Sequence, residues 1–143
     1  MSNTKCTTKG RPSGEKTRCS GRWTEARYRS FIKGNLRSAT RKWAPIQDCK
    51  KEAHIRRGFY RCGGCGEESP ASIVIDRKRV NNIHVDHIKP IIDPSVGFVD
   101  WNDTIDRMFC ESDNLQLLCK RCHDEKCSEE KDIAKARRQK DKL

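Results

Sequence analysis

Two closely spaced cysteine pairs constrain this chain more than any other feature of its 143 residues. Cys62 and Cys65 flank two glycines, and Cys119 and Cys122 flank a lysine and an arginine. Two such C-x2-C pairs supply the four thiolates of a tetrahedral site, which favours zinc. A closed shell of four sulfur ligands leaves no position for a substrate, so we expect a structural zinc ion that joins segments 53 residues apart. The alternative is four unrelated thiols, which the paired spacing disfavours.

The composition leaves little material for a conventional hydrophobic core. Hydrophobic residues make up 34% of the chain and charged residues 36%. Small domains of this kind commonly use a metal ion for stability. The chain starts with a polar, basic stretch that lacks the apolar region of a secretory signal, and it has no apolar run long enough for a membrane span. We therefore expect a soluble cytoplasmic protein, in which paired cysteines bind metal more often than they form disulfides.

The second cysteine pair also fits another pattern. Cys119, Cys122 and His123 match the C-x-x-C-H sequence of c-type haem attachment. Haem attachment would leave Cys62 and Cys65 without a role, and it normally requires export, for which the chain shows no signal. We therefore prefer the zinc interpretation, which uses all four cysteines.

Charge is distributed unevenly along the chain. Residues 1–58 carry 16 basic and 4 acidic side chains, whereas residues 59–127 carry 9 basic and 12 acidic ones. A basic segment attached to a mildly acidic unit is typical of a protein that binds a polyanion, and nucleic acid is the polyanion we expect. A membrane surface is the alternative, but the basic segment lacks the wide apolar face that interfacial anchoring needs.

The sequence divides into four expected segments. Residues 1–21 are rich in Lys, Arg, Gly, Ser and Thr, and we predict a disordered basic arm. Residues 22–57 are predicted to form a basic helical DNA-binding extension. Residues 58–127 are expected to be a zinc-stabilised domain, and residues 128–143 a charged helical tail.

Helix signals occur mainly in the extension. Thr24 is a candidate N-cap for a first helix, and Gly34-Asn35 is expected to interrupt that helix. A second helical stretch runs through Trp43. A third begins at Pro45, which suits the first turn of a helix, and is expected to end at Gly58.

Strand signals begin at Phe59. The runs FYRCGGCG, ASIVI and NIHVDHI predict short strands with a metal-knuckle turn. Asp100 is a candidate cap for a short helix WNDTIDRMF, and NLQLL is expected to be extended. A final helix is predicted to start at about Lys120.

A group of polar residues lies between and beside the cysteine pairs. Asp86 and His87 are adjacent, and Asn114 and His123 follow later in the chain. An aspartate with histidines makes a mixed oxygen and nitrogen site suited to a harder divalent ion than the four-sulfur site. Regular strand geometry sends Asp86 and His87 to opposite faces, so the strand must end or bend there. His84 shares a strand face with Asp86, so an extra ligand is one interpretation, but a solvent-facing strand histidine is the favoured one.

These residues resemble a known family. The segments HVDHIKPI and NLQLLCKRCHDEK, together with both cysteine pairs, resemble the HNH endonucleases, members of the His-Me finger or ββα-metal nucleases. The resemblance covers residues 62–126, about half of the chain. The segment from Trp23 onward, with DWNDTIDRMFCESDNLQLLC, is also similar to small phage-encoded, free-standing HNH proteins of the homing type. The family resemblance implies an α+β fold with a zinc-stapled ββα-metal core and an N-terminal basic helical extension.

The resemblance also implies site roles. His87 would take a proton from the attacking water, since its unperturbed pKa is close to working pH. Asp86 and His123 would hold one Mg2+ or another divalent ion such as Mn2+ against the scissile phosphate. Asn114 would brace the loop that carries His87 through amide hydrogen bonds. The expected products end in 5′-phosphate and 3′-hydroxyl, and a phage-encoded enzyme would act in the cytoplasm of the bacterial host.

The extension supplies the expected DNA contacts. Its basic side chains are interleaved with aromatic ones and are predicted to follow a DNA backbone, in a protein assumed to be monomeric and without a membrane partner. One alternative is a non-catalytic zinc-finger nucleic-acid-binding protein, and another is a nuclease acting on RNA. The predicted DNA-binding residues are Arg22, Arg27, Arg29, Lys33, Arg37, Arg41 and Lys42.

Overall fold

The computed structural model describes residues 14–143 and divides the chain into two compact units, Met1–Ser38 and Ala39–Leu143. The unit boundary therefore falls inside the expected helical extension and not at residues 57–58. Most of the expected basic arm, residues 1–13, lies outside the described residues. None of the helices in the described part of the chain is long and apolar enough to cross a membrane.

The first unit consists of a turn followed by a helix. The backbone groups of Arg18 and Trp23 bond to each other in both directions at 3.0 Å, which closes a turn at the end of the expected basic arm. Helix α1 (Glu25–Thr40) begins there and continues across the unit boundary. Thr24 accepts a hydrogen bond from the Arg27 N–H through its Oγ1 at 3.2 Å, so the predicted N-cap is confirmed.

The expected interruption of this helix at Gly34-Asn35 is wrong, because α1 runs through both residues without a break. A glycine in a helix interior costs only about 1 kcal/mol, which a helix of 16 residues can absorb. Asn35 also donates from Nδ2 to the Phe31 carbonyl, one turn earlier, at 2.8 Å. The side chain that was expected to break the helix therefore bonds along it.

Helix α2 (Ala44–Ala53) opens the second unit with Pro45 in its first turn, as predicted. It ends at Ala53 and not at Gly58. Strand β1 (His54–Arg56) follows, and Gly58, with a φ of +81°, lies in the turn that leads to the next strand. Glycine ends helices and forms hairpin turns through the same access to positive φ. Gly58 therefore marks a change in the chain as predicted, but the change is a hairpin turn and not the end of a helix.

Three small antiparallel sheets carry the rest of the second unit. The first has the order β1-β2-β3, and the second is the tight hairpin β4-β5. The third pairs β6 with β7 through a long connection, residues 88–114, that contains α3, and this pair is called the β6-β7 hairpin below. Asp100 caps helix α3 by accepting the Asp103 N–H at 2.7 Å, as predicted. Helix α4 begins at Lys120, also as predicted. The remaining bounds are β2 (Phe59–Arg61), β3 (Glu68–Pro70), β4 (Ser72–Ile75), β5 (Lys78–Asn81), β6 (Ile83–His87), α3 (Trp101–Met108), β7 (Leu115–Cys119) and α4 (Lys120–Asp141).

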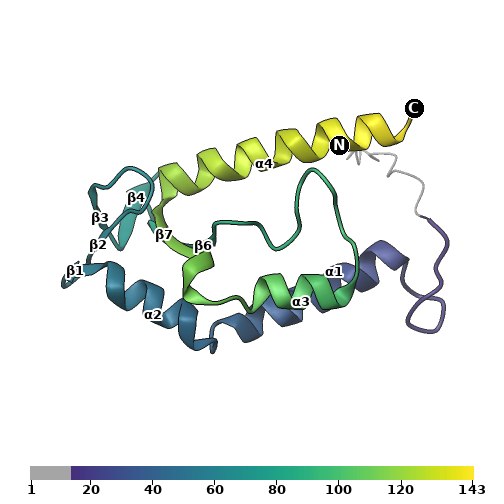
Figure 1. Cartoon of the computed structure of the whole chain (residues 1–143), viewed down its shortest axis with the longest axis horizontal. Coiled ribbons are helices and arrows are strands. Elements are labelled where there is room, and N and C mark those ends of the chain that lie inside the picture. Colours follow the sequence, from purple (N-terminus) through teal and green to yellow (C-terminus); the bar gives the residue numbers. More distant parts are fainter. Residues whose placement is uncertain (1–13) are drawn as a thin grey trace, which may run out of the picture. The chain divides into compact units, whose positions relative to one another are not determined.

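The β6-β7 hairpin is the centre of this unit, with α4 on one side of it and α2 on the other (Figure 1). Its register runs from Ile83 opposite Cys119 to His87 opposite Leu115. The buried hydrophobic residues are few and gather on or beside this hairpin. They are Cys62, Ile83, Met108, Leu115, Leu117, Leu118 and Cys119.

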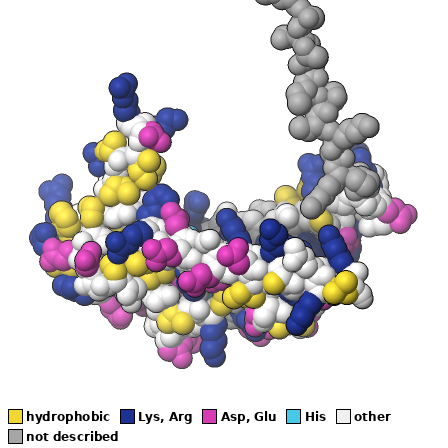
Figure 2. Space-filling model, turned by 90° about the horizontal axis from the view of Figure 1, so that it is seen from above, with side chains coloured by type: hydrophobic (Ala, Val, Ile, Leu, Met, Phe, Trp, Pro, Cys, Tyr) yellow, Lys and Arg dark blue, Asp and Glu magenta, His cyan; other side chains and the backbone are white. Residues whose placement is uncertain are grey.

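The described chain is thus a mixed α+β structure of four α-helices and small antiparallel sheets. Its surface carries basic and acidic side chains side by side, as the face drawn in Figure 2 shows. Two cysteines, Cys62 and Cys119, belong to the small core, which agrees with the expectation that a metal substitutes for apolar packing.

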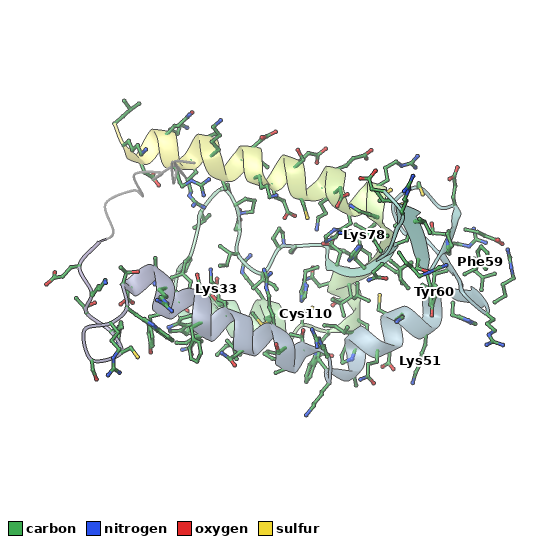
Figure 3. All side chains as sticks on the ribbon, turned by 180° about the vertical axis from the view of Figure 1, so that it is seen from behind. Lys33, Lys51, Phe59, Tyr60, Lys78 and Cys110 are labelled. Atoms are coloured by element: carbon green, nitrogen blue, oxygen red, sulfur yellow. The ribbon has the colours of Figure 1, made fainter. Side chains whose placement is uncertain are left out.

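Trp43 gives a direct test of the packing of this unit. Its ring nitrogen donates to the Cys110 carbonyl at 2.7 Å, and its ring meets Phe109 edge-on at 5.7 Å (Cys110 is labelled in Figure 3). Trp43→Phe keeps an aromatic ring but removes the donor, so we expect the free energy of unfolding to fall by about 1–2 kcal/mol. Urea denaturation measures this, with Trp101→Phe as the control. Equal losses in both variants would show that the hydrogen bond contributes nothing.

Candidate functional site

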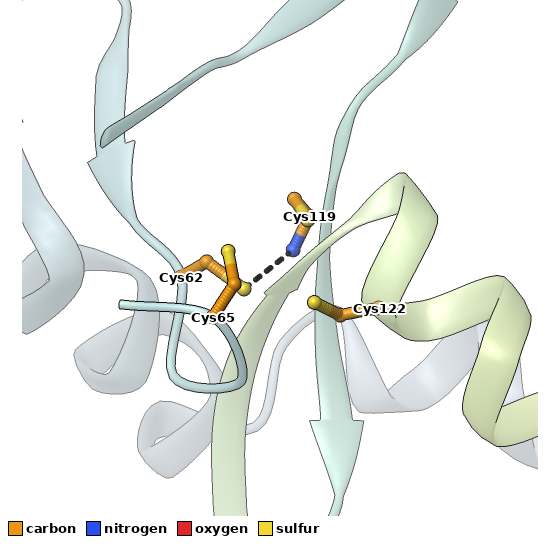
Figure 4. A group of neighbouring side chains, drawn as sticks. All are labelled: Cys62, Cys65, Cys119 and Cys122. Carbon is orange, nitrogen blue, oxygen red and sulfur yellow. Dashed lines mark hydrogen bonds between the residues drawn. The ribbon is translucent and has the colours of Figure 1, made fainter. Parts of the chain in front are cut away.

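The four paired cysteines converge on one point (Figure 4). Their Sγ atoms all lie within 4.8 Å of one another, although 53 residues separate the pairs. A Zn–S distance of ~2.3 Å in a tetrahedron corresponds to about 3.8 Å between sulfurs, so this cluster fits a structural metal such as zinc. Cys62 follows β2, Cys119 ends β7, and Cys122 lies in the first turn of α4.

Backbone N–H groups point at the cluster. Cys62 Sγ accepts from the Cys119 N–H at 3.2 Å and from the Gly64 N–H at 3.4 Å. Burial raises the pKa of the Cys62 thiol, but the N–H groups of Cys119, Cys65 and Gly64 outweigh it and bring this pKa to about 6. Burial and the three neighbouring cysteines raise the pKa of Cys122 to about 12. The site is built to hold thiolate, and a bound cation is what allows all four thiols to ionise together.

The glycines of the first knuckle are required by close packing. A Cβ at Gly64 would lie 3.1 Å from Cys122 Sγ and 3.2 Å from Leu118 Cδ2, and a Cβ at Gly63 would lie 3.3 Å from the Leu117 carbonyl oxygen. A side chain at either glycine would therefore require these neighbours to shift by a few tenths of an ångström.

The second group of candidate residues lies where β6 meets α4. Successive side chains of a strand point to opposite faces. His84 and Asp86, two residues apart, therefore lie on one face of the hairpin, and His87 lies on the other. Helix α4 covers the first face. The Asp86 carboxylate contacts Lys126 Nζ at 2.5 Å, and the His84 ring stacks on His123, with centroids 4.4 Å apart and planes 19° apart.

Asp86 and His123 therefore lie at the same strand–helix interface. Within residues 14–143, however, the four cysteines are the only group of three or more His, Cys, Asp or Glu donors close enough to share an ion. Asp86 is instead satisfied by Lys126 and by the Gln116 side-chain amide at 3.2 Å.

His87 faces the other way. Strand β6 ends at this residue and the chain then bends, as expected, but the register holds through His87. Its Nε2 lies 2.9 Å from the Met108 carbonyl at the end of α3. A carbonyl oxygen only accepts, so Nε2 carries the hydrogen and Nδ1 is left as the basic nitrogen. The side chains of Asp86 and His87 thus point to opposite faces.

Asn114 contacts the chain directly after His87. Its Oδ1 accepts from the Lys89 N–H at 2.9 Å, its Nδ2 donates to the Lys89 carbonyl at 3.3 Å, and its own carbonyl accepts from the Ile88 N–H at 2.8 Å. These are the bracing amide bonds that the sequence led us to expect of this residue.

The solvent-facing interpretation of His84 holds only in part, because the residue is half-buried and its ring stacks on His123. Burial lowers the pKa of His84, and the neighbouring His123 lowers it further, so the ring is neutral near pH 7. Neutral imidazole is the form that binds metals.

Sequence reasoning missed Lys126 and Cys127. Lys126 Nζ contacts the Asp86 carboxylate, the His87 carbonyl at 2.5 Å and Glu130 at 3.3 Å, while Cys127 Sγ lies 3.7 Å from His123 Nε2. Both follow His123 by one helical turn and so share its face of α4, which is the signal that would have found them.

The predicted DNA-binding side chains of α1 are partly engaged within the first unit. Glu25 contacts Arg18 at 2.8 Å and Arg29 at 3.7 Å, and the Arg27 guanidinium lies over the Trp23 ring at 4.9 Å. Three of the predicted residues follow each other at intervals of four along α1 and therefore share one face, namely Arg29, Lys33 and Arg37. Arg22, Arg41 and Lys42 are exposed.

No family model, curated protein or solved structure matches this chain. The geometry of the described residues is therefore the basis for assigning a function.

The sulfur cluster predicts a strong dependence on metal. We expect about one bound zinc per chain in the wild type, as measured by elemental analysis. Cys62→Ser removes one soft ligand, so we expect the zinc content of the variant to fall well below one per chain. Zinc binding at such sites contributes ~10 kcal/mol or more to folding, so thermal unfolding followed by circular dichroism should shift strongly downward. Cys49→Ser, outside the cluster, is the control and should retain zinc. Full zinc content in Cys62→Ser would contradict the four-sulfur site.

The Asn114 contacts predict a local effect. Asn114→Ala loses both amide bonds to Lys89, and we expect faster hydrogen exchange at the Lys89 amide and a loss of about 1–2 kcal/mol in unfolding free energy. Asn114→Asp keeps an acceptor for the Lys89 N–H and should protect that amide better. The Ile88 amide, bonded to the backbone of Asn114, serves as internal reference. Unchanged exchange at Lys89 in both variants would show that the side chain does not hold this segment.

Proposed function

We propose that this chain is a metal-dependent DNA endonuclease of the HNH type, which hydrolyses phosphodiester bonds and leaves 5′-phosphate and 3′-hydroxyl ends. The observation that carries the proposal is the β6-β7-α4 junction. There Asp86 and His123 lie at one interface, His87 ends the strand, and Asn114 holds the next turn of chain. The sulfur cluster joins the far ends of the same elements.

The environment of Asp86 supports cation binding. An ammonium group, Lys126 Nζ, sits between the Asp86 carboxylate and the His87 carbonyl, each at 2.5 Å. A divalent ion held by this carboxylate would have to displace the Lys126 ammonium, because two cations at one carboxylate repel each other. Asp86 and His123 would hold Mg2+ or Mn2+ there, and the bound ion would stabilise charge on the phosphate and on the departing oxygen.

His87 is proposed as the general base. The hydrogen bond from Nε2 to the Met108 carbonyl fixes the ring and its tautomer, so Nδ1 is the nitrogen that would accept a proton from water. Because His87 lies on the other face from Asp86, the phosphate would reach both groups around the end of β6. The bend after His87, braced by Asn114, leaves that end accessible.

Binding would depend on the basic side chains of the N-terminal part of the chain. Residues 1–58 carry an excess of 12 positive charges, and contacts between such side chains and phosphates release counterions. We therefore expect affinity for duplex DNA to fall steeply as salt increases. The residues proposed to contact phosphate are Arg22, Arg27, Arg29, Lys33, Arg37, Arg41 and Lys42.

One observation favours a second candidate function. The Asp86 carboxylate already has two partners, Lys126 and Gln116, and points away from His87. These contacts give Asp86 a purely structural role, with no bound ion. The second candidate function is therefore a non-catalytic zinc-dependent nucleic-acid-binding protein.

His87→Ala separates the two candidates. We expect the wild-type chain to nick or linearise supercoiled plasmid with Mg2+ or Mn2+ and not with EDTA, and the variant to lose at least about 100-fold in rate. Zinc content and DNA affinity should stay unchanged in the variant. His54→Ala, which removes an exposed histidine of β1, is the matched control. Absence of plasmid cleavage by the wild type with every ion would favour the binding protein, and cleavage of RNA duplex alone would change the substrate.

A further inference from the structure

The β4-β5 hairpin is a feature of the second unit to which the proposed function gives no role. Its four residue pairs run from Ser72 opposite Asn81 to Ile75 opposite Lys78. The two turn residues, Asp76 and Arg77, have φ values of 49° and 65°, which is the conformation of a tight two-residue turn that matches strand twist. The tip is therefore held in a defined shape.

Positive charge is concentrated at this tip. Arg77, Lys78 and Arg79 are consecutive and exposed, and Asp76 is the only acidic residue of the hairpin. Within the described part of the chain, none of the three basic side chains forms an ion pair, and Arg79 donates only to Ser72 Oγ at 2.8 Å. Three cations without counterions on a projecting element favour a polyanionic partner.

Apolar side chains accompany this charge. Val74 is 60% exposed and shares a face of the hairpin with its partner Arg79. The opposite face is different, because Ile73 and Ile75 line a cleft together with Lys120 and Arg121 at the start of α4. One face of the hairpin is thus turned toward the protein, and the face with Val74 and Arg79 is free to meet a partner.

The hairpin is also continuous with the proposed site. Strand β5 passes through Asn82 directly into β6, so Lys78 (labelled in Figure 3) precedes Asp86 by only eight residues. From Lys78 to Asp86 the extended chain spans at most about 27 Å, at 3.3–3.4 Å per residue. That distance corresponds to about eight base pairs of B-form DNA, at ~3.4 Å per base pair. The DNA major groove is ~12 Å wide and admits a two-stranded ribbon, whereas the deep, narrow major groove of A-form RNA does not.

We propose that the β4-β5 hairpin enters the major groove of duplex DNA within about eight base pairs of the cleaved bond. Arg77 in the turn and Arg79 on the free face would contact phosphate or guanine edges, and Val74, the partner of Arg79, would contact base methyl groups. The inference rests on the proposed function only for the nature of the duplex and the place of the cut.

A double variant tests the contact without damaging the turn. Arg77→Gly fits the positive φ of this position, and Arg79→Gln removes the second charge while keeping an amide donor for Ser72, so the hairpin should persist. The control is Lys131→Gln with Lys135→Gln on the exposed surface of α4, which removes the same net charge. Binding to duplex DNA is measured by fluorescence anisotropy in EDTA over a salt series, with zinc content and circular dichroism as checks of folding.

We expect the tip variant to lose about tenfold or more in affinity and the slope of log K against log salt to fall by roughly 1–2, as for the loss of one or two phosphate contacts. The control should change little. Methylation of guanine N7 by dimethyl sulfate should be blocked by the wild-type chain near the cut and restored by the tip variant.

Equal losses in the tip and control variants would overturn the proposal, as would unprotected guanine N7 in the wild-type complex. An equal loss of affinity for an RNA duplex would show that the hairpin does not enter a DNA groove. His87→Ala, with its hairpin intact, should bind like the wild type. If tip-dependent binding and N7 protection persist in a chain that never cleaves, the nuclease assignment fails and the hairpin proposal stands.

Discussion

Four sulfur atoms within 4.8 Å of one another hold together the ends of the elements on which the rest of the second unit depends. The apolar core alone is small, and two of its members are cysteines of this cluster. A metal bound by the cluster would bridge a gap of 53 residues, restrict the unfolded chain and fix the start of α4 against the knuckle after β2. The glycine at position 64 shows how close this approach is, since any side chain there would press on Cys122.

The register of the β6-β7 hairpin decides what each candidate residue can do. Because Ile83 pairs with Cys119, the metal cluster and the hairpin alignment are tied together. That alignment sends Asp86 toward α4 and His87 toward α3, and a shift of one residue would reverse both. The positions of Asp86 and His87 therefore depend on a strand register that begins beside the sulfur cluster.

Several features of this arrangement could be predicted from local chemistry. The caps at Thr24 and Asp100, the strands beside the knuckles and the start of α4 at Lys120 all follow from signals within a few residues. Gly34 and Gly58 were misjudged because glycine tolerates helices at modest cost and serves hairpins as well as helix ends. The sulfur cluster was predictable because its spacing is diagnostic of metal binding.

The environment of Asp86 could not be predicted in the same way. Lys126 lies 40 residues away in sequence, and only the packing of α4 on the hairpin brings its ammonium to the carboxylate. His84 was expected on the solvent side for the same reason, because nothing in the sequence indicates that a later helix covers this face. Long-range pairs of this kind depend on where a helix packs in the folded chain, and the local sequence pattern carries no information about that placement.

Strand β7 passes into α4 without an intervening residue, since Cys119 ends the one and Lys120 begins the other. Because no residue separates the two elements, the cysteine cluster, which includes Cys119 and Cys122, lies directly at the corner between them. Loss of a metal bound at this corner would free the first turn of α4, and His123, Lys126 and Cys127 lie in that turn and the next. The contacts of Asp86 and His84 with α4 thus begin within two turns of the cysteine cluster.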